Sequence, residues 1–178
     1  LGPMIASLYL SFTDYNLLSA PEWIGLENYQ QMLDDPRLHK ALGVTFVYVF
    51  VGVPLLLLVA LGVAMLLNHG IRALPFYRSV YYLPSLLGGS VAVGILWREI
   101  FGEDGLVNQF LALFGIQGIA WVSDPSTALG TLILLNAWTF GSSMVIFLAG
   151  LRQIPEMYYE AASLDGAGRW REFRFITL

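Results

Sequence analysis

The stretch from 41 to 67, ALGVTFVYVFVGVPLLLLVALGVAMLL, contains 27 consecutive residues without a charged side chain. An α-helix of this length would be about 40 Å long, which exceeds the roughly 30 Å hydrocarbon core of a bilayer. Two further uncharged stretches, at 79–97 and 125–151, contain 19 and 27 residues. In lipid, a segment must bond its own backbone polar groups, so we expect all three to be membrane-spanning helices.

The composition of the chain also indicates a membrane protein. Of its 178 residues, 57% are hydrophobic and 12% are charged, whereas about 25% of the residues of ordinary soluble domains are charged. So few polar side chains cannot cover a soluble globule, and an integral membrane protein is the expected class. The chain has no Cys and two isolated His, and its formal net charge is −4. We therefore expect no disulfide, no metal site, no cofactor and no nucleic-acid partner.

The orientation in the membrane depends on residues 105–123, which are uncharged but interrupted by Gly115 and Gly118. If this segment spans the membrane, the arginines of 160–178 lie outside the cell. If it lies at the outer interface, the basic residues divide into six inside (Arg72, Arg78, Arg152, Arg169, Arg171, Arg174) and three outside (Arg37, Lys40, Arg98). The positive-inside rule favours the second arrangement.

This orientation divides the chain into the segments of a single transmembrane domain. Residues 1–13 are uncharged but short, so we interpret them as the remnant of a first membrane helix. A secretory signal is the competing interpretation, but the segment has no basic leader and no small-residue cleavage site. The expected order is then an outer loop (14–40), membrane helices (41–67, 77–97 and 125–151), an outer interfacial segment (98–124) and a cytoplasmic region (152–174).

Residues 160–178, EAASLDGAGRWREFRFITL, have the features of a helical hairpin outside the membrane. Glu160 complements the positive N-terminal end of a helix. Ala161 and Ala162 leave a shallow surface on which another protein can sit closely, and Gly166 suits a helix C-terminus where the chain reverses. From the residues alone, a solvated loop and a protein-docking finger are equally consistent with this pattern.

The spacing of this segment is that of a known signature. Glu-Ala-Ala, three residues, Gly, nine residues, Ile, one residue and Leu resemble EAA---G---------I-LP, the cytoplasmic signature of the membrane subunits of binding-protein-dependent ABC importers. Every fixed position is filled except the final proline, because Leu178 ends the chain. Four stretches also resemble the sugar-permease branch (maltose, lactose and glycerol-3-phosphate types): SLYLSFTDYN at 7–16, IGLENYQ at 24–30, FYRSVYYLPS at 76–85 and FLAGLRQIPEMYYEAASLDGA at 147–167.

The resemblance implies an all-α polytopic membrane protein of the bacterial cytoplasmic (inner) membrane. Its fold would be a type I-like ABC importer transmembrane domain, truncated at both ends. The hairpin would be the coupling helix, which contacts a separate ATP-binding cassette subunit through Glu160, Ala161, Ala162 and Gly166. The other implied partners are a second homologous permease subunit in a heterodimer, an extracytoplasmic solute-binding protein, the lipid bilayer and a sugar.

The chain lacks the residues of two competing classes of protein. It has no Gly-x-x-x-x-Gly-Lys-Ser/Thr loop, and its only lysine, Lys40, lies in the expected outer loop. We therefore expect no catalytic residues and place ATP hydrolysis in another subunit. The stretches 41–67, 79–97 and 125–151 contain no Asp, Glu, Lys or Arg, which disfavours an ion-coupled secondary carrier. An ion-coupled secondary carrier and a non-transporting membrane scaffold are the two alternatives to an ABC importer permease.

Polar residues in the last expected span are candidates for a substrate path. Asn136, Thr139 and Ser143 are spaced i, i+3 and i+7, so a continuous helix would place them on one face, with Trp138 and Ser142 adjacent. Amides, hydroxyls and an aromatic ring suit a carbohydrate. The same residue types form hydrogen bonds between packed membrane helices, and that alternative stays open.

Overall fold

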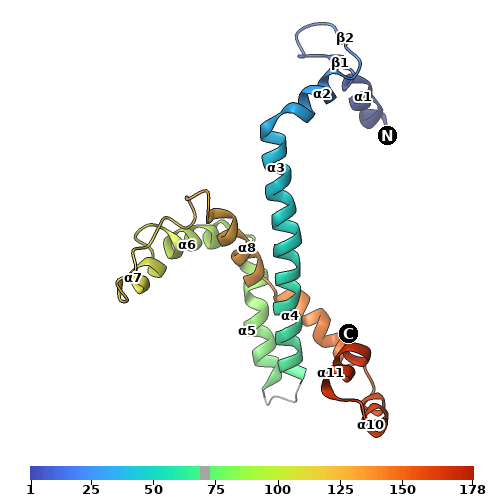
Figure 1. The fold of residues 1–178 in the computed structure, drawn as a ribbon, viewed down its shortest axis with the longest axis vertical. Helices are drawn as coiled ribbons and strands as arrows, with labels where there is room; N and C mark the ends of the chain where they lie inside the picture. Colours follow the sequence, from blue (N-terminus) through green and yellow to red (C-terminus); the bar gives the residue numbers. More distant parts are fainter. Residues whose placement is uncertain (69–72) are drawn as a thin grey trace. The chain divides into compact units, whose positions relative to one another are not determined.

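A computed structural model describes residues 1–68 and 73–178 of the chain (Figure 1). The basic residue Arg72, used above for the orientation, and His69 lie outside the described residues. The described chain is helical apart from connections and one small β-hairpin. It separates into two compact units, Leu1–Val47 and Tyr48–Leu178.

The first unit is held together by aromatic rings beside the hairpin. The ring of Phe12 stacks on Trp23 with centroids 5.5 Å apart and meets Tyr29 at 5.4 Å. The strands pair antiparallel with Thr13 opposite Trp23, and Asn28 donates hydrogen bonds of 3.0 Å to the carbonyls of Ser11 and Thr13. The elements of this unit are α1 (Gly2–Leu10), β1 (Thr13–Asp14), β2 (Glu22–Trp23), α2 (Glu27–Asp34) and α3 (Pro36–Val47).

One helix of the described chain is long enough by itself to cross a membrane. It runs from Pro36 to Asn68, contains 33 residues and has a mean hydropathy of 2.8 in its most apolar window. It consists of α3, the π-helical turn η1 (Tyr48–Gly52) and α4 (Val53–Asn68). Pro54 is the second residue of α4, two positions after the end of the π-helical turn. Proline has no N–H to donate and crowds the carbonyl four residues earlier, which explains why the regular bonding changes there.

The span expected over 77–97 is not one straight helix. Helix α5 (Leu74–Leu87) and the helical stretch that begins at Val91 meet at 96°. Two adjacent glycines, Gly88 and Gly89, disfavour a continuous helix at this point. Ser90 then caps α6 (Val91–Phe101), because its Oγ accepts a hydrogen bond of 3.3 Å from the N–H of Val93.

The span expected over 125–151 is also broken. Helices α8 (Ala128–Trp138) and α9 (Gly141–Leu151) differ in direction by 44°. At the end of α8 the hydroxyl of Thr139 donates a 2.7 Å hydrogen bond to the carbonyl of Asn136, a local bond that competes with the helical ladder. If each bent pair counts as one span, the described residues contain three segments long and apolar enough to cross a membrane.

Residues 105–123 form a folded loop around Asn108. Helix α7 (Leu106–Ala112) has only 7 residues, so it is about 10 Å long and too short to cross a bilayer. The Nδ2 of Asn108 donates to the carbonyls of Gly102, Glu103 and Ile119, and its Oδ1 accepts a 2.6 Å bond from the indole N–H of Trp121. The location of this loop at the outer interface stays a prediction.

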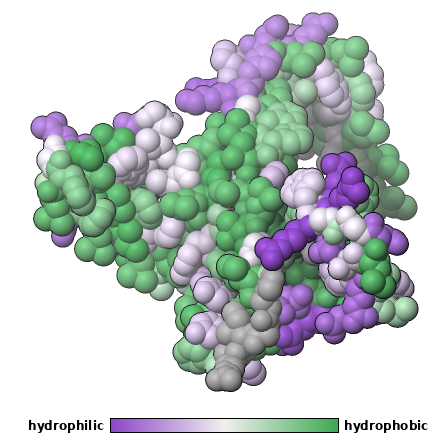
Figure 2. All heavy atoms as spheres, turned by 60° about the horizontal axis from the view of Figure 1, so that its bottom comes forward, coloured by the Kyte–Doolittle hydropathy of each residue, from purple (hydrophilic) through white to green (hydrophobic). Residues whose placement is uncertain are grey.

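The core of the second unit lies between α4 and α9, and α9 also packs on α5. Its buried residues are Ala60, Ala64, Leu67, Met144, Leu148 and Leu151. The two alanines let the helices approach closely, as small residues do in membrane proteins. Apolar side chains also cover much of the exterior (Figure 2), which is the surface expected of helices that face lipid or other membrane helices.

Candidate functional site: the signature segment and a polar cavity

The signature segment folds as two short helices joined by a tight turn. They are α10 (Glu156–Leu164) and α11 (Arg169–Glu172), and the π-helical turn η2 (Phe173–Thr177) extends the second; we call residues 153–178 the finger. Gly166 has a φ of +74°, in the left-handed region. Its N–H donates to the carbonyl of Ser163 at 3.1 Å, and the N–H of Ala167 donates to that of Ala162 at 2.9 Å. This pair of bonds is the Schellman helix end, which glycine favours, so Gly166 reverses the chain as its sequence position predicted.

The two halves of the signature meet in one groove of about 620 Å³ on the finger. Ala161 and Ala162 lie on one wall, and Phe175 and Ile176 lie on the other. Ala161 is exposed and Ala162 is half-buried, whereas Glu160 and Gly166 are exposed and do not line the groove. The complete lining is Gln153, Ile154, Pro155, Tyr158, Ala161, Ala162, Asp165, Phe175 and Ile176.

Another face of the finger lies against the ends of two core helices. A hollow there is lined by Met65 and Asn68 of α4, by Leu151 of α9, and by finger residues that include Tyr159 and Thr177. The hydroxyl of Tyr159 lies 3.1 Å from the Oγ1 of Thr177, so a hydrogen bond joins α10 to η2. The finger is therefore folded back on itself and sits next to the α4–α9 core.

Two of the five candidate substrate-path residues line a common cavity. Asn136 and Thr139 border a cavity of about 440 Å³, together with Tyr48, Ser85, Gly88, Gly89, Leu132 and Leu135. Both side chains are half-buried. A Cβ placed on Gly88 would lie 2.3 Å from the methyl group of Thr139, so this glycine allows the break after α5 to touch the break after α8.

The other three candidates do not line this cavity, and the continuous helix assumed for a single polar face is bent by 44°. Trp138 packs beside Trp97, with ring centroids 6.3 Å apart. Ser142 lines a different groove, and Ser143 is half-buried and lines none of the described cavities. The spacing argument required a continuous helix, and the bend between Trp138 and Gly141 rotates the two halves relative to each other.

The sequence is similar to that of known transport proteins. A family model described as "Binding-protein-dependent transport system inner membrane component" matches residues 35–178. The chain belongs to this family. It is 55% identical over 178 residues to the probable ABC transporter permease protein YesP of Bacillus subtilis, covering 99% of this chain and 58% of that protein. It is 33% identical over 176 residues to the probable starch degradation products transport system permease protein AmyD of Thermoanaerobacterium thermosulfurigenes, covering 98% of this chain and 60% of that protein.

A solved structure has the same fold as this inner membrane component. It is the crystal structure of a bacterial alginate ABC transporter in complex with an alginate pentasaccharide-bound periplasmic protein, with a TM-score of 0.75 and 22% identity. The match covers 99% of this chain and 59% of that chain. The fold is thus that of an all-α ABC importer transmembrane domain. The chain spans about three fifths of the length of the curated relatives it matches, 58% and 60% for the two named above.

Sequence reasoning on this permease-family chain missed residues that line the cavity at Asn136. Tyr48 lies 88 positions before Asn136 and reaches the cavity only through the packing of η1 on α8. Ser85, Gly88 and Gly89 form a cluster of small and hydroxyl residues in the sequence, a pattern more typical of close helix packing than of a ligand site. The structure gives Gly88 that packing role and also places it at the cavity.

Proposed function

We propose that the chain is the membrane-spanning permease part of a bacterial ABC importer that moves a sugar or sugar-like solute by alternating access. A separate ATPase subunit drives the transport, a second homologous permease completes the pathway, and an extracytoplasmic binding protein delivers the solute. The observation that carries this proposal is the groove where Ala161 and Ala162 meet Ile176. Membership of the family and the starch-product relative support the transport class and the sugar.

The finger is the proposed docking element for the ATPase. Glu160, Ala161, Ala162 and Gly166 form the contact in this proposal, with the small side chains admitting a close approach of the partner backbone. Phe175, which is 77% exposed, adds apolar area beside them. Because the opposite face of the finger lies against α4 and α9, movement of the ATPase has a direct route to the membrane helices.

The cavity at Asn136 is the proposed sugar-contacting region. It combines an amide (Asn136), hydroxyls (Thr139, Ser85) and an aromatic residue (Tyr48), the groups that bind carbohydrate hydroxyls and ring faces. The hydroxyl of Thr139 is already bonded to a backbone carbonyl, so Asn136 has the larger free hydrogen-bonding capacity. Trp138, Ser142 and Ser143 are weaker candidates, since none of them lines this cavity.

Transport assays on the complete permease test this proposal. The protein reconstituted with its ATPase and partner permease should hydrolyse ATP faster when loaded binding protein is added, and the isolated chain should not bind ATP. Asn136→Ala should raise the solute concentration for half-maximal uptake by about fivefold or more, because loss of a hydrogen bond costs about 1 kcal/mol or more. Ser143→Ala, which changes a residue outside the cavity, is the matched control. Uptake driven by an ion gradient without ATP would refute the assignment.

A further inference from the structure

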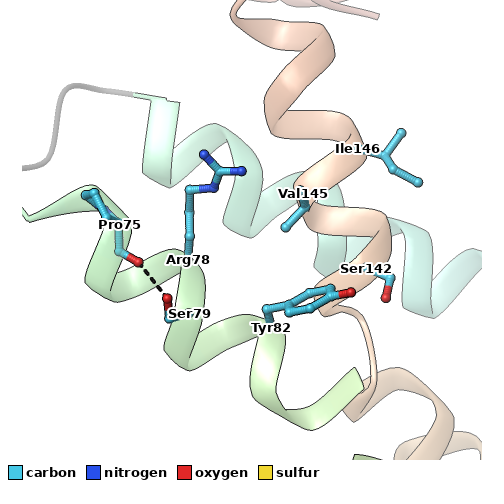
Figure 3. A pocket seen from close by; sticks show the side chains of 7 residues that line it. All are labelled: Pro75, Arg78, Ser79, Tyr82, Ser142, Val145 and Ile146. Carbon is cyan, nitrogen blue, oxygen red and sulfur yellow. Dashed lines mark hydrogen bonds between the residues drawn. The ribbon is translucent and has the colours of Figure 1, made fainter. Parts of the chain in front are cut away.

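A second polar groove, of about 570 Å³, lies between α5 and α9, apart from the finger and from the cavity at Asn136 (Figure 3). Its walls are Pro75, Arg78, Ser79 and Tyr82 of α5 and Ser142, Val145 and Ile146 of α9. The α5 residues are spaced i, i+3, i+4 and i+7, and the α9 residues i, i+3 and i+4. Each set therefore occupies one helix face, and the two faces together form the groove.

The groove begins where the two helix backbones touch. A Cβ placed on Gly141 would lie 2.4 Å from the carbonyl oxygen of Tyr81 and 2.7 Å from the Cα of Tyr82. From this contact, α5 leads back toward Pro75 while α9 leads forward toward Ile146. The groove thus opens toward the N-terminal end of α5, which is the cytoplasmic end in the orientation favoured by the basic residues.

Three hydrogen-bond donors of this groove have no side-chain partner in the part of the chain that the structure describes. They are the guanidinium of Arg78 and the hydroxyls of Tyr82 and Ser142. The neighbouring hydroxyl of Ser79, in contrast, donates a 3.0 Å hydrogen bond to the carbonyl of Pro75. Figure 3 shows Tyr82 reaching from α5 toward the side of α9 that carries Ser142.

We propose that this groove binds one anionic phospholipid of the cytoplasmic leaflet. The guanidinium of Arg78 binds the phosphate, and the hydroxyls of Tyr82 and Ser142 donate to the ester carbonyls. Arg78 precedes Tyr82 by four residues, which is about 6 Å of helix rise. This offset places the hydroxyls deeper than the cation, as the esters lie deeper than the phosphate in a phospholipid. Val145 and Ile146 supply apolar wall, and Ile146 is 71% exposed.

The chemistry of the groove favours a lipid over a free anion. Arg78 is the only charged residue among the described lining residues, so the groove offers one cation beside an apolar wall, which suits a phosphodiester that carries acyl chains. The cytoplasmic leaflet carries the anionic lipids, and basic pockets between membrane helices on that side bind their headgroups. The inference depends on the orientation of α5 but not on the identity of the transported solute.

Lipid binding to the complete transporter tests the proposal. The probe is a fluorescent phosphatidylglycerol added to the transporter in phosphatidylcholine nanodiscs. We expect one saturable site, and Arg78→Gln should weaken its affinity by at least about tenfold, as expected for a charge-assisted interaction. Tyr82→Phe and Ser142→Ala should each weaken it severalfold, and Arg78→Lys should retain part of it. Arg98→Gln, at the opposite end of the α5–α6 pair, is the matched control and should bind as the wild type does.

Three results would overturn the assignment. Wild-type affinity in Arg78→Gln would show that the guanidinium does not bind the lipid. Displacement of the probe by inorganic phosphate at equal concentration would indicate a free-anion site. Absence of a saturable site in the wild type would mean that another part of the transporter fills the groove. Retention of the ATPase subunit by each variant, measured in parallel, shows that the variant is folded and assembled.

Discussion

A side chain at Gly166 can have two separate effects: backbone strain within the finger, and a clash with the ATPase if the turn docks there. The φ of +74° lies in the left-handed region, and a Cβ at this position meets nothing within 4 Å in the described chain. A substituted residue therefore introduces backbone strain of about 1 kcal/mol but no clash within the chain. Asn tolerates this backbone region better than Ala does, although its side chain is larger. Backbone strain therefore predicts that Gly166→Ala is the more damaging substitution, whereas side-chain size predicts that Gly166→Asn is.

The order in which the Gly166 variants lose the ATPase distinguishes a turn that docks on the ATPase from a turn that contacts no partner. If strain alone acts, Gly166→Ala should lower the ratio of native to non-native turn by about fivefold, and Gly166→Asn should lower it less. If the turn enters a cleft of the ATPase, Gly166→Asn and Gly166→Asp should release the ATPase from membranes more readily than Gly166→Ala. We expect the second order, with loss of transport and intact membrane insertion in Gly166→Asp. Glu160→Ala should weaken retention more mildly, because it removes one charge-assisted contact.

The control for this series is Gly168→Ala. Gly168 has a φ of −78° and open space around it, so an alanine there adds neither strain nor a clash. The measurement is ATPase retention on washed membranes together with solute uptake. Retention that is better in Gly166→Asn than in Gly166→Ala would show that strain alone acts. Normal uptake and retention in Gly166→Asp would remove the finger from the docking interface.

Three further predictions concern the cavity, the orientation and the turn before α8. Gly88→Ala should destabilise the protein by about 1–3 kcal/mol because its Cβ would overlap the methyl group of Thr139, and adding Thr139→Ser should restore thermal stability and uptake. Single cysteines at Ser126 and Ser163 should label from opposite sides of the membrane with an impermeant reagent, and labelling of both in intact cells would contradict the orientation. Hydrogen bonds from the hydroxyl and N–H of Ser126 lower the pKa of Asp124. They therefore stabilise the turn at pH values above the pKa that Asp124 has in the unfolded chain, and this stabilisation is lost as the pH falls through its lower pKa in the folded chain. Ser126→Ala should raise the pKa of Asp124, as measured by infrared titration of its carboxyl. The remaining stabilisation of the turn should then be lost at a higher pH than in the wild type.

The features that the sequence predicts well are those set by local chemistry. The uncharged run at 41–67 requires a helix in lipid, and the structure contains that helix within Pro36–Asn68. The turn at Gly166 is likewise local, since a glycine after a helix of small residues favours the left-handed end that the structure shows. In both cases the neighbouring residues along the chain are sufficient to determine the backbone.

The features that the sequence does not predict depend on packing between distant segments. Nothing in the local sequence marks Asn108 as special, yet its amide organises the loop from Gly102 to Trp121 through four hydrogen bonds. The break at Thr139 is similar. Threonine occurs in many continuous helices, and here its local bond to Asn136 coincides with the contact between its methyl group and Gly88. Ser143 follows this break and does not line the cavity.

In the proposed function, the packing of α9 connects the finger to the cavity. The finger lies against the end of α9 at Leu151, and α9 is fixed to α4 through Met144 and Leu148, which are 0% and 1% exposed. Close-packed residues of this kind move together. In the proposed coupling, we therefore expect a displacement of the finger to move α9 as a body and the backbone change to fall at the break between α8 and α9, where Thr139 lies against Gly88. Because both residues line the cavity, a rotation at this break alters the cavity itself, and the Gly88–Thr139 contact is where coupling can be measured.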